Sequence, residues 1–333
     1  MVLSDGNRKS LLVYDRARGS RAGAVAQPLR HILGPDTGIG FIAGVDVDPV
    51  RHQFYAVNND IEDRLVVFDY DDNGNVKPRR MLYVPHQAWG VSLNRPRGEM
   101  AISVQQLGMV AIYRQEAKGL EAPLRIIRGP NTGMADAHGI EWDIQNHEIV
   151  VANHGNYAVV TPYSAYDVPA SNTASLSLGG HFQAPSITTY SETAKGDAKP
   201  LRVIQGSRTE LNWPMGIALD STRDEIAVAN NGNNSVLVYR RTARGNALPV
   251  RVLRGSRTGL NGPIAVAIDT KNEELWVANY GDHSALVFAR TASGNVAPKR
   301  ILRNAPAGTP TGGFGNPYAV AYDSKREEIL VPN

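Results

Sequence analysis

The sequence predicts an all-β fold, a closed ring of six blades with four antiparallel strands in each blade. A unit of about 49 residues recurs six times along the 333-residue chain. Each copy contains four short segments of β-branched and aromatic residues, bounded by Gly, Asn, Asp or Pro, which is typical of strands. The two ends of the chain supply complementary halves of one copy. Four strands per repeat is the unit of a β-propeller blade, and we label the strands a to d from the centre outward.

Strands a and b are defined by a constant spacing. Strand a is clearest at residues 214–220 and 263–269 and ends on Asp or Asn in every copy: Asp48, Asn94, Asp143, Asp220, Asp269 and Asp323. Five residues later strand b begins, at Gln53, Glu99, Glu148, Glu225, Glu274 and Glu328. Strand b often ends on Asn, and we expect these Asn side chains to cap the turn between strands b and c.

Strands c and d form the outer half of each repeat. Strand c lies at residues 235–239 and 284–288, and the Gly-Asn turns at 243–246 and 292–295 lead from it to strand d. Strand d carries an Arg in each copy: Arg30, Arg80, Arg125, Arg202, Arg251 and Arg300. We expect these Arg side chains to form ion pairs with the acids at the end of strand a and the start of strand b of their own blade.

The chain ends complete one blade between them. Residues 1–34 supply only strands c (11–15) and d (28–33), and residues 317–333 supply only strands a (318–323) and b (328–331). Their pairing would close the ring and leave no free sheet edge. We therefore treat residues 1–333 as a single propeller domain. Residues 2–4 also resemble the end of a strand b, as expected of a piece of a longer array of blades.

One connection is much longer than the others. The interval from Asp143 to Asp220 is 77 residues, against 49 from Asp220 to Asp269. The extra length forms an insertion at about residues 154–184, in the b–c loop of the third full blade. It contains Tyr157, Tyr163 and Tyr166, and Tyr is enriched at protein interfaces. A long loop on a rigid scaffold is often a binding element, although a tolerated surface excursion is the alternative.

The same blade departs from the repeat in its chemistry. His138 stands near the start of strand a, where other blades have apolar residues that include Trp89 and Tyr318. Glu141, and Asp46 in another blade, replace an Ala found in three repeats, and His154 follows strand b. We expect a ligand or partner near His138, Glu141 and His154, on the face that carries the d–a and b–c loops, here called the top face. Trp89, Tyr318 and the three Tyr of the insertion would add contacts.

A divalent metal at the top of the central channel is one interpretation of these side chains. Imidazole and carboxylate are adequate ligands for Zn, Mn or Fe. The ligands would be His138, His154 and Glu141, with Asp46 contributed by a neighbouring blade. The alternative for the two carboxylates is a solvated channel wall. No other cofactor is indicated.

Composition excludes several classes of protein. The chain has no Cys, so it has no disulfides, thiolate metal sites or Cys nucleophiles. No run of about 18 apolar residues is present, so we expect no transmembrane segment, and the first residues lack the features of a signal peptide. The net charge of +3 is weak evidence for nucleic acid. No nucleophile elbow, Walker A loop or H-E-x-x-H motif occurs.

Two motifs resemble known propeller repeats. Val-Ala-Asn at 228–230, with Gly and Asn before Ser-Val-Leu-Val-Tyr at 235–239, resembles the YVTN-type repeat. Pro-x-Gly-Ile-Ala-x-Asp at 214–220 resembles the NHL-type repeat. The resemblance covers essentially the whole chain and implies a six-bladed propeller of a kind common in periplasmic, secreted and cell-surface proteins.

What the resemblance implies for function is broader. It favours a non-enzymatic binding or scaffold module that contacts a protein partner through its top face or rim. A place within a larger multi-blade or surface assembly is compatible with this role. One alternative is a metal-dependent lyase or lactone hydrolase, because six-bladed relatives hold a central zinc with His from several blades. A second alternative is RNA binding, as in some NHL domains, through Arg208 and Arg257; the lack of a basic and aromatic stripe disfavours it.

Overall fold

The computed structural model describes residues 9–59, 62–157, 181–303 and 319–332. These residues form strands and short 3-10 helices, and they contain no α-helix. The 3-10 helices are η1 (Pro35–Thr37), η2 (Arg95–Arg97), η5 (Ser207–Thr209), η6 (Asn231–Asn233) and η7 (Tyr280–Asp282). In the described part of the chain, no helix has the length and apolar character needed to cross a membrane.

The strands form four-stranded antiparallel sheets, each of which is a blade. Blade 1 has β3 (Ile42–Asp48), β4 (Gln53–Asn58), β5 (Arg64–Asp69) and β6 (Arg80–Tyr83). Blade 2 has β7 (Ala88–Asn94), β8 (Glu99–Val104), β9 (Met109–Arg114) and β10 (Arg125–Ile127). Blade 3 has β11 (Ala137–Asp143), β12 (Glu148–Asn153), β15 (Ser186–Ser191) and β16 (Arg202–Gln205).

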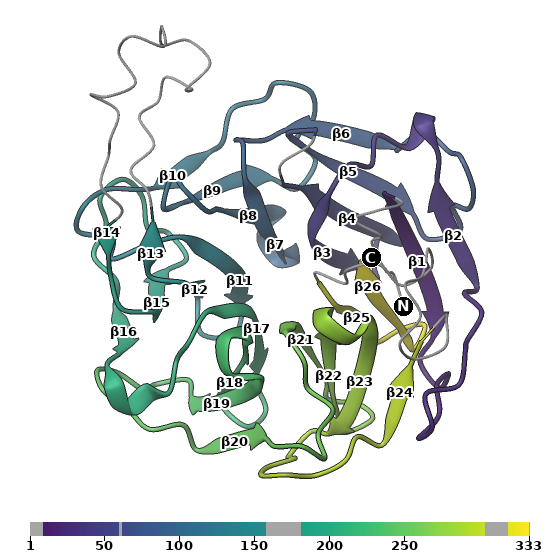
Figure 1. Cartoon of the computed structure of the whole chain (residues 1–333). Helices are drawn as coiled ribbons and strands as arrows, with labels where there is room; N and C mark the ends of the chain where they lie inside the picture. The colour runs from purple at the N-terminus through teal and green to yellow at the C-terminus, as the bar shows by residue number, and fades with distance from the viewer. Residues whose placement is uncertain (1–8, 60–61, 158–180, 304–318, 333) are drawn as a thin grey trace, which may run out of the picture.

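The second half of the chain repeats this pattern. Blade 4 has β17 (Pro214–Asp220), β18 (Glu225–Asn230), β19 (Ser235–Arg240) and β20 (Arg251–Arg254). Blade 5 has β21 (Pro263–Asp269), β22 (Glu274–Asn279), β23 (Ser284–Ala289) and β24 (Arg300–Leu302). The terminal blade has β1 (Ser10–Asp15), β2 (Arg30–Leu33), β25 (Ala321–Asp323) and β26 (Glu328–Pro332). The prediction of an all-β propeller with four-stranded antiparallel blades is confirmed (Figure 1).

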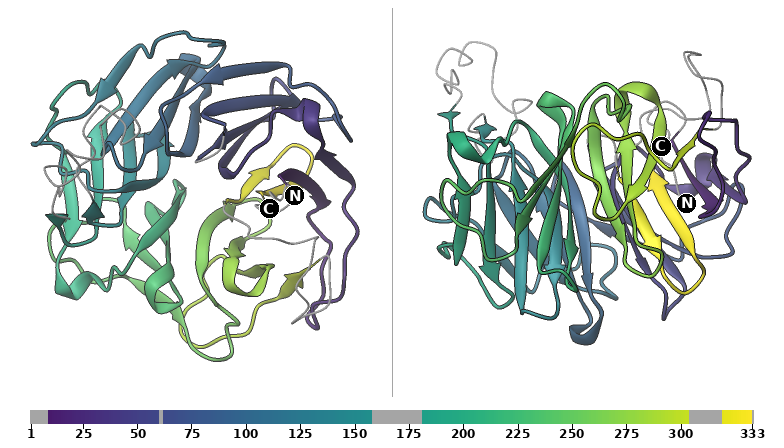
Figure 2. Two further views of the ribbon diagram at one scale, coloured as in Figure 1. Left: turned by 45° about the horizontal axis from the view of Figure 1, so that its top comes forward. Right: turned by 90° about the horizontal axis from the view of Figure 1, so that it is seen from below.

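The terminal blade joins the two ends of the chain. Its strand order is β2-β1-β26-β25, and Leu11 pairs with Pro332 while Asp15 pairs with Glu328. Both views in Figure 2 place β1 beside the C-terminal strand. The predicted pairing between N-terminal strands c and d and C-terminal strands a and b is therefore present.

The Arg of strand d lies within its own blade, as predicted, but it contacts only one of the two expected acids. In blade 5, Arg300 contacts both carboxylate oxygens of Glu274 at 2.7 and 2.8 Å. The equivalent pairs in other blades are Arg30–Glu328, Arg125–Glu99, Arg202–Glu148 and Arg251–Glu225. In blade 1, which has Gln53 in place of Glu, Arg80 lies 3.1 Å from the Tyr55 hydroxyl instead. The acid at the end of strand a has a different partner.

That partner comes from the next blade. The residue directly after strand c reaches the last residue of strand a in the preceding blade, an arrangement we call the inter-blade latch. The best-defined latch joins Gln115 Nε2 to Asp48 Oδ2 at 2.6 Å. The others are Glu192–Asn94, Arg241–Asp143, Arg290–Asp220 and Arg16–Asp269. The last of these connects the terminal blade to blade 5. In blade 1 the residue at this position is Tyr70, and burial and the nearby Asp323 of the terminal blade raise its pKa.

The outer edge of each blade is also covered by its neighbour. The Gly in the c–d turn of one blade bonds to strand d of the blade before it: Gly119 donates to Met81 O at 2.7 Å and accepts from Tyr83 N–H at 2.8 Å. Gly74, Gly196, Gly245 and Gly294 form equivalent bridges, and Ser20 replaces them in the terminal blade. These bridges occupy backbone groups that an edge strand would otherwise expose.

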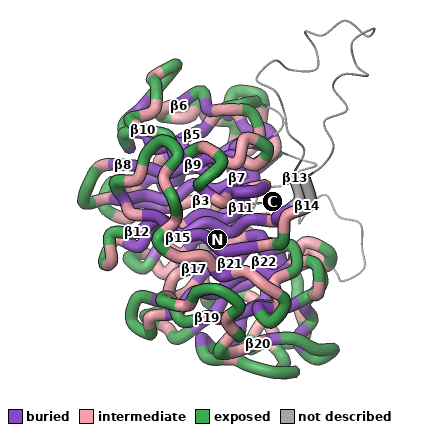
Figure 3. The backbone as a smooth tube through the Cα atoms, turned by 90° about the vertical axis from the view of Figure 1, so that its left-hand side faces the viewer, coloured by how far each residue is buried: buried purple, intermediate pink, exposed green. Residues whose placement is uncertain are grey.

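The core lies between adjacent blades, and strands are buried while turns are exposed (Figure 3). Glycines allow the inner strands to converge. A Cβ on Gly139 would lie 2.4 Å from Met215 O, and one on Gly44 would lie 2.3 Å from Trp89 O. Both distances are far below contact, so strand a needs Gly at these places. The close approach also brings the strand-a side chains of different blades around one central space.

Candidate functional site

The side chains predicted to form a site separate into two groups. His138 and His154 meet on the top face, where strand a begins and strand b ends. Glu141 and Asp46 lie farther along strand a and line a central cavity. The sequence predicted both groups as one constellation, and the geometry distinguishes them because His138 is absent from the cavity lining.

His138 is the second residue of β11, and hydrogen bonds engage both nitrogens of its ring. Its Nδ1 lies 2.9 Å from the carbonyl oxygen of Asp136, and its Nε2 lies 2.8 Å from the side-chain amide nitrogen of Gln105. Asn59 donates to the Gln105 oxygen at 2.9 Å, which turns the amide N–H toward His138. Burial and the adjacent His154 lower the pKa of His138 to about 3. His138 is therefore held as a neutral imidazole.

His154 lies directly against this ring. The two imidazoles are stacked with ring centroids 3.7 Å apart. The stack continues on both sides, with Trp89 at 4.5 Å from His138 and Trp213 at 5.8 Å from His154. We call these four residues the aromatic stack; they come from blades 2 and 3 and from the loop that leads into blade 4. His154 Nε2 also contacts the sulfur of Met215.

Asp136 organises the two His residues. Its carbonyl accepts a hydrogen bond from the His154 backbone N–H at 3.1 Å as well as contacting His138 Nδ1. Its carboxylate lies 3.4 Å from His154 Nδ1 and 3.8 Å from His138 Nδ1. Asp136 adopts a left-handed backbone with φ of 54°, a conformation that Asp tolerates better than most residues. The d–a loop thus directs one carboxylate toward both rings.

Asp136, His138 and His154 are close enough to be metal ligands. One ligand atom from each lies within 4.8 Å of the other two. Of the predicted metal ligands, this group includes His138 and His154 but neither Glu141 nor Asp46. His138 would have to give up one of its two hydrogen bonds to offer a nitrogen lone pair. The arrangement as it stands is a hydrogen-bonded imidazole stack.

Glu141 and Asp46 belong to the central cavity, which has a volume of about 220 Å³. Asp46 accepts backbone N–H groups of Val47 at 2.6 Å and Leu93 at 2.8 Å, and Arg95 lies 3.6 Å away. Burial raises the pKa of Asp46, although Arg95 opposes this effect. Burial and the nearby Asp46 raise the pKa of Glu141 to about 8.

The remaining predicted residues are placed only in part. Trp89 joins the aromatic stack and also lines the cavity. The backbone of Tyr157 lies in β13 (Asn156–Tyr157), which pairs with β14 (His181–Phe182) inside the predicted insertion. Tyr163, Tyr166 and Tyr318 lie outside the described residues.

Sequence reasoning missed Asp136, Gln105, Arg95 and Trp213. Trp213 had a readable signal, because it precedes Pro214 where the next repeat has Gly262 before Pro263. Both residues are left-handed, with φ of 51° for Trp213 and 60° for Gly262. A large aromatic residue at a position suited to Gly is an anomaly that the aligned repeats alone could have revealed.

Comparisons with known proteins support the fold and leave the activity open. No family model matches the sequence, and no curated protein matches it. Among solved structures, the crystal structure of a nidogen/laminin complex contains a similar chain, with a TM-score of 0.58 and 14% sequence identity. The match covers 91% of this chain and 95% of that chain. At this identity the similarity concerns the fold alone.

Proposed function

We propose that this protein is a non-enzymatic binding module that holds another protein against its top face, with Trp213 as the central contact. The single observation that carries this proposal is the state of Trp213. Its side chain is 51% exposed although it is large and apolar, and its backbone is left-handed. Such a backbone costs about 1 kcal/mol or more for a residue with a Cβ, and strain of this kind gathers at binding sites.

The surroundings of Trp213 suit a protein partner. Trp is enriched among residues that dominate protein interfaces. Its ring rests on His154, and His154 rests on the rigidly bonded His138, so the aromatic stack presents an ordered surface. The β13–β14 hairpin lies on the same face because it connects strand b to strand c of blade 3.

The wider architecture is consistent with this role. We infer one six-bladed ring, since the chain forms six four-stranded sheets and β1 pairs with β26 to join the two chain ends in one of them. One solved structure with a similar fold is a nidogen/laminin complex. From the resemblance to NHL-type and YVTN-type repeats, we further propose that the protein acts outside the cytoplasm.

A metal-dependent lyase or lactone hydrolase is the second candidate, and the observation in its favour is the group of Asp136, His138 and His154. A metal there would supply Lewis-acid polarisation of a bound carbonyl. The hydrogen bonds on both His138 nitrogens oppose it. We therefore rank it below protein binding.

The test uses Trp213→Gly. Gly suits the left-handed backbone, so the variant should unfold at the wild-type temperature or higher. Peptides selected from a random 12-residue phage library on the wild-type protein should bind the variant at least tenfold more weakly, as measured by fluorescence polarisation. The matched control is Leu120→Ser, which removes an apolar side chain that is 86% exposed, away from the stack. Selected peptides that bind Trp213→Gly as tightly as wild type would contradict the proposal.

A further inference from the structure

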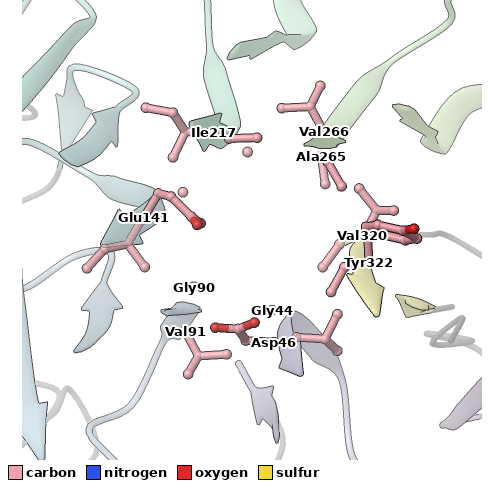
Figure 4. Close-up of a pocket in the computed structure, with 18 of the residues that line it drawn as sticks. Gly44, Asp46, Gly90, Val91, Glu141, Ile217, Ala265, Val266, Val320 and Tyr322 are labelled. Atoms are coloured by element: carbon pink, nitrogen blue, oxygen red, sulfur yellow. The ribbon is translucent and has the colours of Figure 1, made fainter. Parts of the chain in front are cut away.

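The central cavity is chemically two-sided. The third residue from the end of strand a is Ala218 in blade 4, Ala267 in blade 5 and Ala321 in the terminal blade, so this wall is apolar. On the opposite wall the equivalent residues are Asp46 and Glu141. Figure 4 shows the Glu141 and Asp46 side chains directed into the cavity, with Val266 and Val320 on its far side.

The charges in this cavity are incompletely paired. Arg95 is the cationic side chain among the lining residues, and it bonds to the carbonyl of Val47 and lies beside Asp46. Asp46 also accepts two backbone N–H groups. In the described part of the chain, Glu141 makes no hydrogen bond or ion pair within the protein. One carboxyl group therefore faces the cavity without a partner, because the single guanidinium of the lining pairs with Asp46.

We propose that this cavity binds a primary alkylammonium group, with the nitrogen against Glu141 and the alkyl chain against the apolar wall. An ammonium group donates three hydrogen bonds and carries the missing charge. A divalent cation fits less well, because hard cations require six or more oxygen ligands. The apolar wall would also be left without a contact.

The same chemistry has two sources: a free alkylamine, or a lysine side chain presented by a polypeptide. A cavity of about 220 Å³ has room for a four-carbon chain and its ammonium group. This inference does not depend on Trp213. Its test requires no protein partner, so its failure would leave the proposed function untouched.

The experiment is an NMR-detected titration of the full chain with n-butylammonium chloride at pH 9. We expect saturable binding in the millimolar range, since a ligand of five heavy atoms supplies little contact area. n-Butanol and sodium butyrate, which lack the positive charge, should bind at least tenfold more weakly. Glu141→Gln should reduce n-butylammonium affinity at least tenfold, while Asp71→Asn, at a carboxylate that is 91% exposed elsewhere, should not change it.

Two further arms sharpen the result. Binding should release a proton and tighten between pH 6 and pH 9, because the cation favours the ionised form of Glu141. Acetyl-Gly-Lys-Gly-amide replaces the free amine in a parallel titration. Binding by either compound that is lost in Glu141→Gln supports the proposal, and the tighter of the two identifies the source.

The overturning results are equally definite. Equal binding of n-butylammonium to wild type and to a folded Glu141→Gln, checked by thermal unfolding, would refute the site. Binding of n-butanol as tight as that of n-butylammonium would show that charge is irrelevant. The proposal would also be rejected if neither amine showed saturable binding at concentrations up to roughly 100-fold above the expected millimolar dissociation constant, since a ligand of this size that binds more weakly is not held specifically.

Discussion

His138 and Glu141 lie three residues apart on β11, and their polar side chains differ in how far hydrogen bonds compensate for burial. His138 is 2% exposed and remains neutral, with one hydrogen bond on each ring nitrogen. Glu141 faces the cavity without such bonds, and burial beside Asp46 favours its protonated form. A buried polar group that is fully bonded contributes order to the structure, whereas one without partners lowers stability when it ionises.

Glu141→Gln should therefore stabilise the protein in a pH-dependent manner. The pKa of Glu141 is raised from 4.5 to about 8 in the folded state. The contribution of the protonated Glu141 carboxyl to the free energy of unfolding is fully present below pH 4.5, and it is lost as the pH rises toward 8. The free energy of unfolding of Glu141→Gln should match wild type near pH 4.5 and exceed it by about 2 kcal/mol at pH 8, a value below full linkage because the carboxyl borders a cavity.

The measurement is urea unfolding of both proteins at half-unit steps from pH 4.5 to pH 9. Asp71→Asn serves as the control, since its exposed carboxylate should show no such trend. A constant difference between Glu141→Gln and wild type at every pH would contradict the assignment of a raised pKa to Glu141.

The sequence predicted only some of the features of these individual residues. Aligned repeats revealed that His138, Glu141 and Asp46 differ from their counterparts, because a repeat supplies its own reference. They could not reveal that His138 and Glu141 serve separate sites, since this depends on which side of strand a each residue faces near a bulge in β11. Gln105 was missed because its contact with His138 joins two different blades. Asp136 was missed because its role arises where the d–a loop meets His154, in the b–c loop of the same blade.

At the scale of elements, the inter-blade latch joins strand c of one blade to strand a of the blade before. Its chemistry varies from Arg to Gln and Glu, so no residue type marks it in the sequence. The expected bond between strand-d Arg and the acid ending strand a was wrong for this reason. The predicted Asn caps do bond the b–c turn, since Asn230 donates to Asn233 Oδ1 at 2.6 Å. They also hold the d–a loop, because Asn279 accepts from Asn261 N–H at 2.7 Å.

Arg290→Ala should be the most destabilising latch substitution. Arg290 is 6% exposed and bonds to Asp220, which is 2% exposed, and to Glu273. Its removal leaves a buried carboxylate unpaired, which costs about 3–5 kcal/mol. The free energy of unfolding measured in urea should fall by that amount.

Arg223→Ala is the matched control, because Arg223 contacts the same Asp220 at 4.0 Å and is 42% exposed. Its effect should stay within about 0.5 kcal/mol, as for other exposed ion pairs. Similar losses in the two variants would argue against the latch. Adding Asp220→Asn to Arg290→Ala should recover part of the stability, since the unpaired charge is then absent.

At the scale of the whole molecule, ring closure depends on residues 1–34. Their removal takes away β1 and β2, so β26 keeps β25 on one side and has an unpaired edge where β1 was. An unpaired edge promotes association between chains. The truncated protein should form aggregates in size-exclusion chromatography and lose its single cooperative unfolding transition.

A peptide of residues 9–34 supplies the matched rescue. Added to the truncated protein, it should restore the monomeric elution volume, because it contains both missing strands. A truncated protein that stays monomeric and unfolds at the wild-type temperature would show that closure contributes little.

Most of this architecture was predictable, because a propeller repeats its signal. The spacing from the end of strand a to the start of strand b identified all the blades, including the divided terminal blade. The latches were not predictable, since each joins residues that are between 67 and 253 positions apart and they share no common residue type. Local patterns specify blades, whereas contacts between blades specify the ring.

The register of the terminal blade also determines how the ring would respond to mechanical load. Leu11 pairs with Pro332 and Asp15 pairs with Glu328. The N-terminal end of β1 and the C-terminal end of β26 therefore lie at the same end of their shared ladder. A tension applied through those two ends would peel the strands apart one pair at a time, as a zipper opens, instead of shearing the whole ladder at once. The ring would thus part at the pairing of β1 with β26 under a small pulling force.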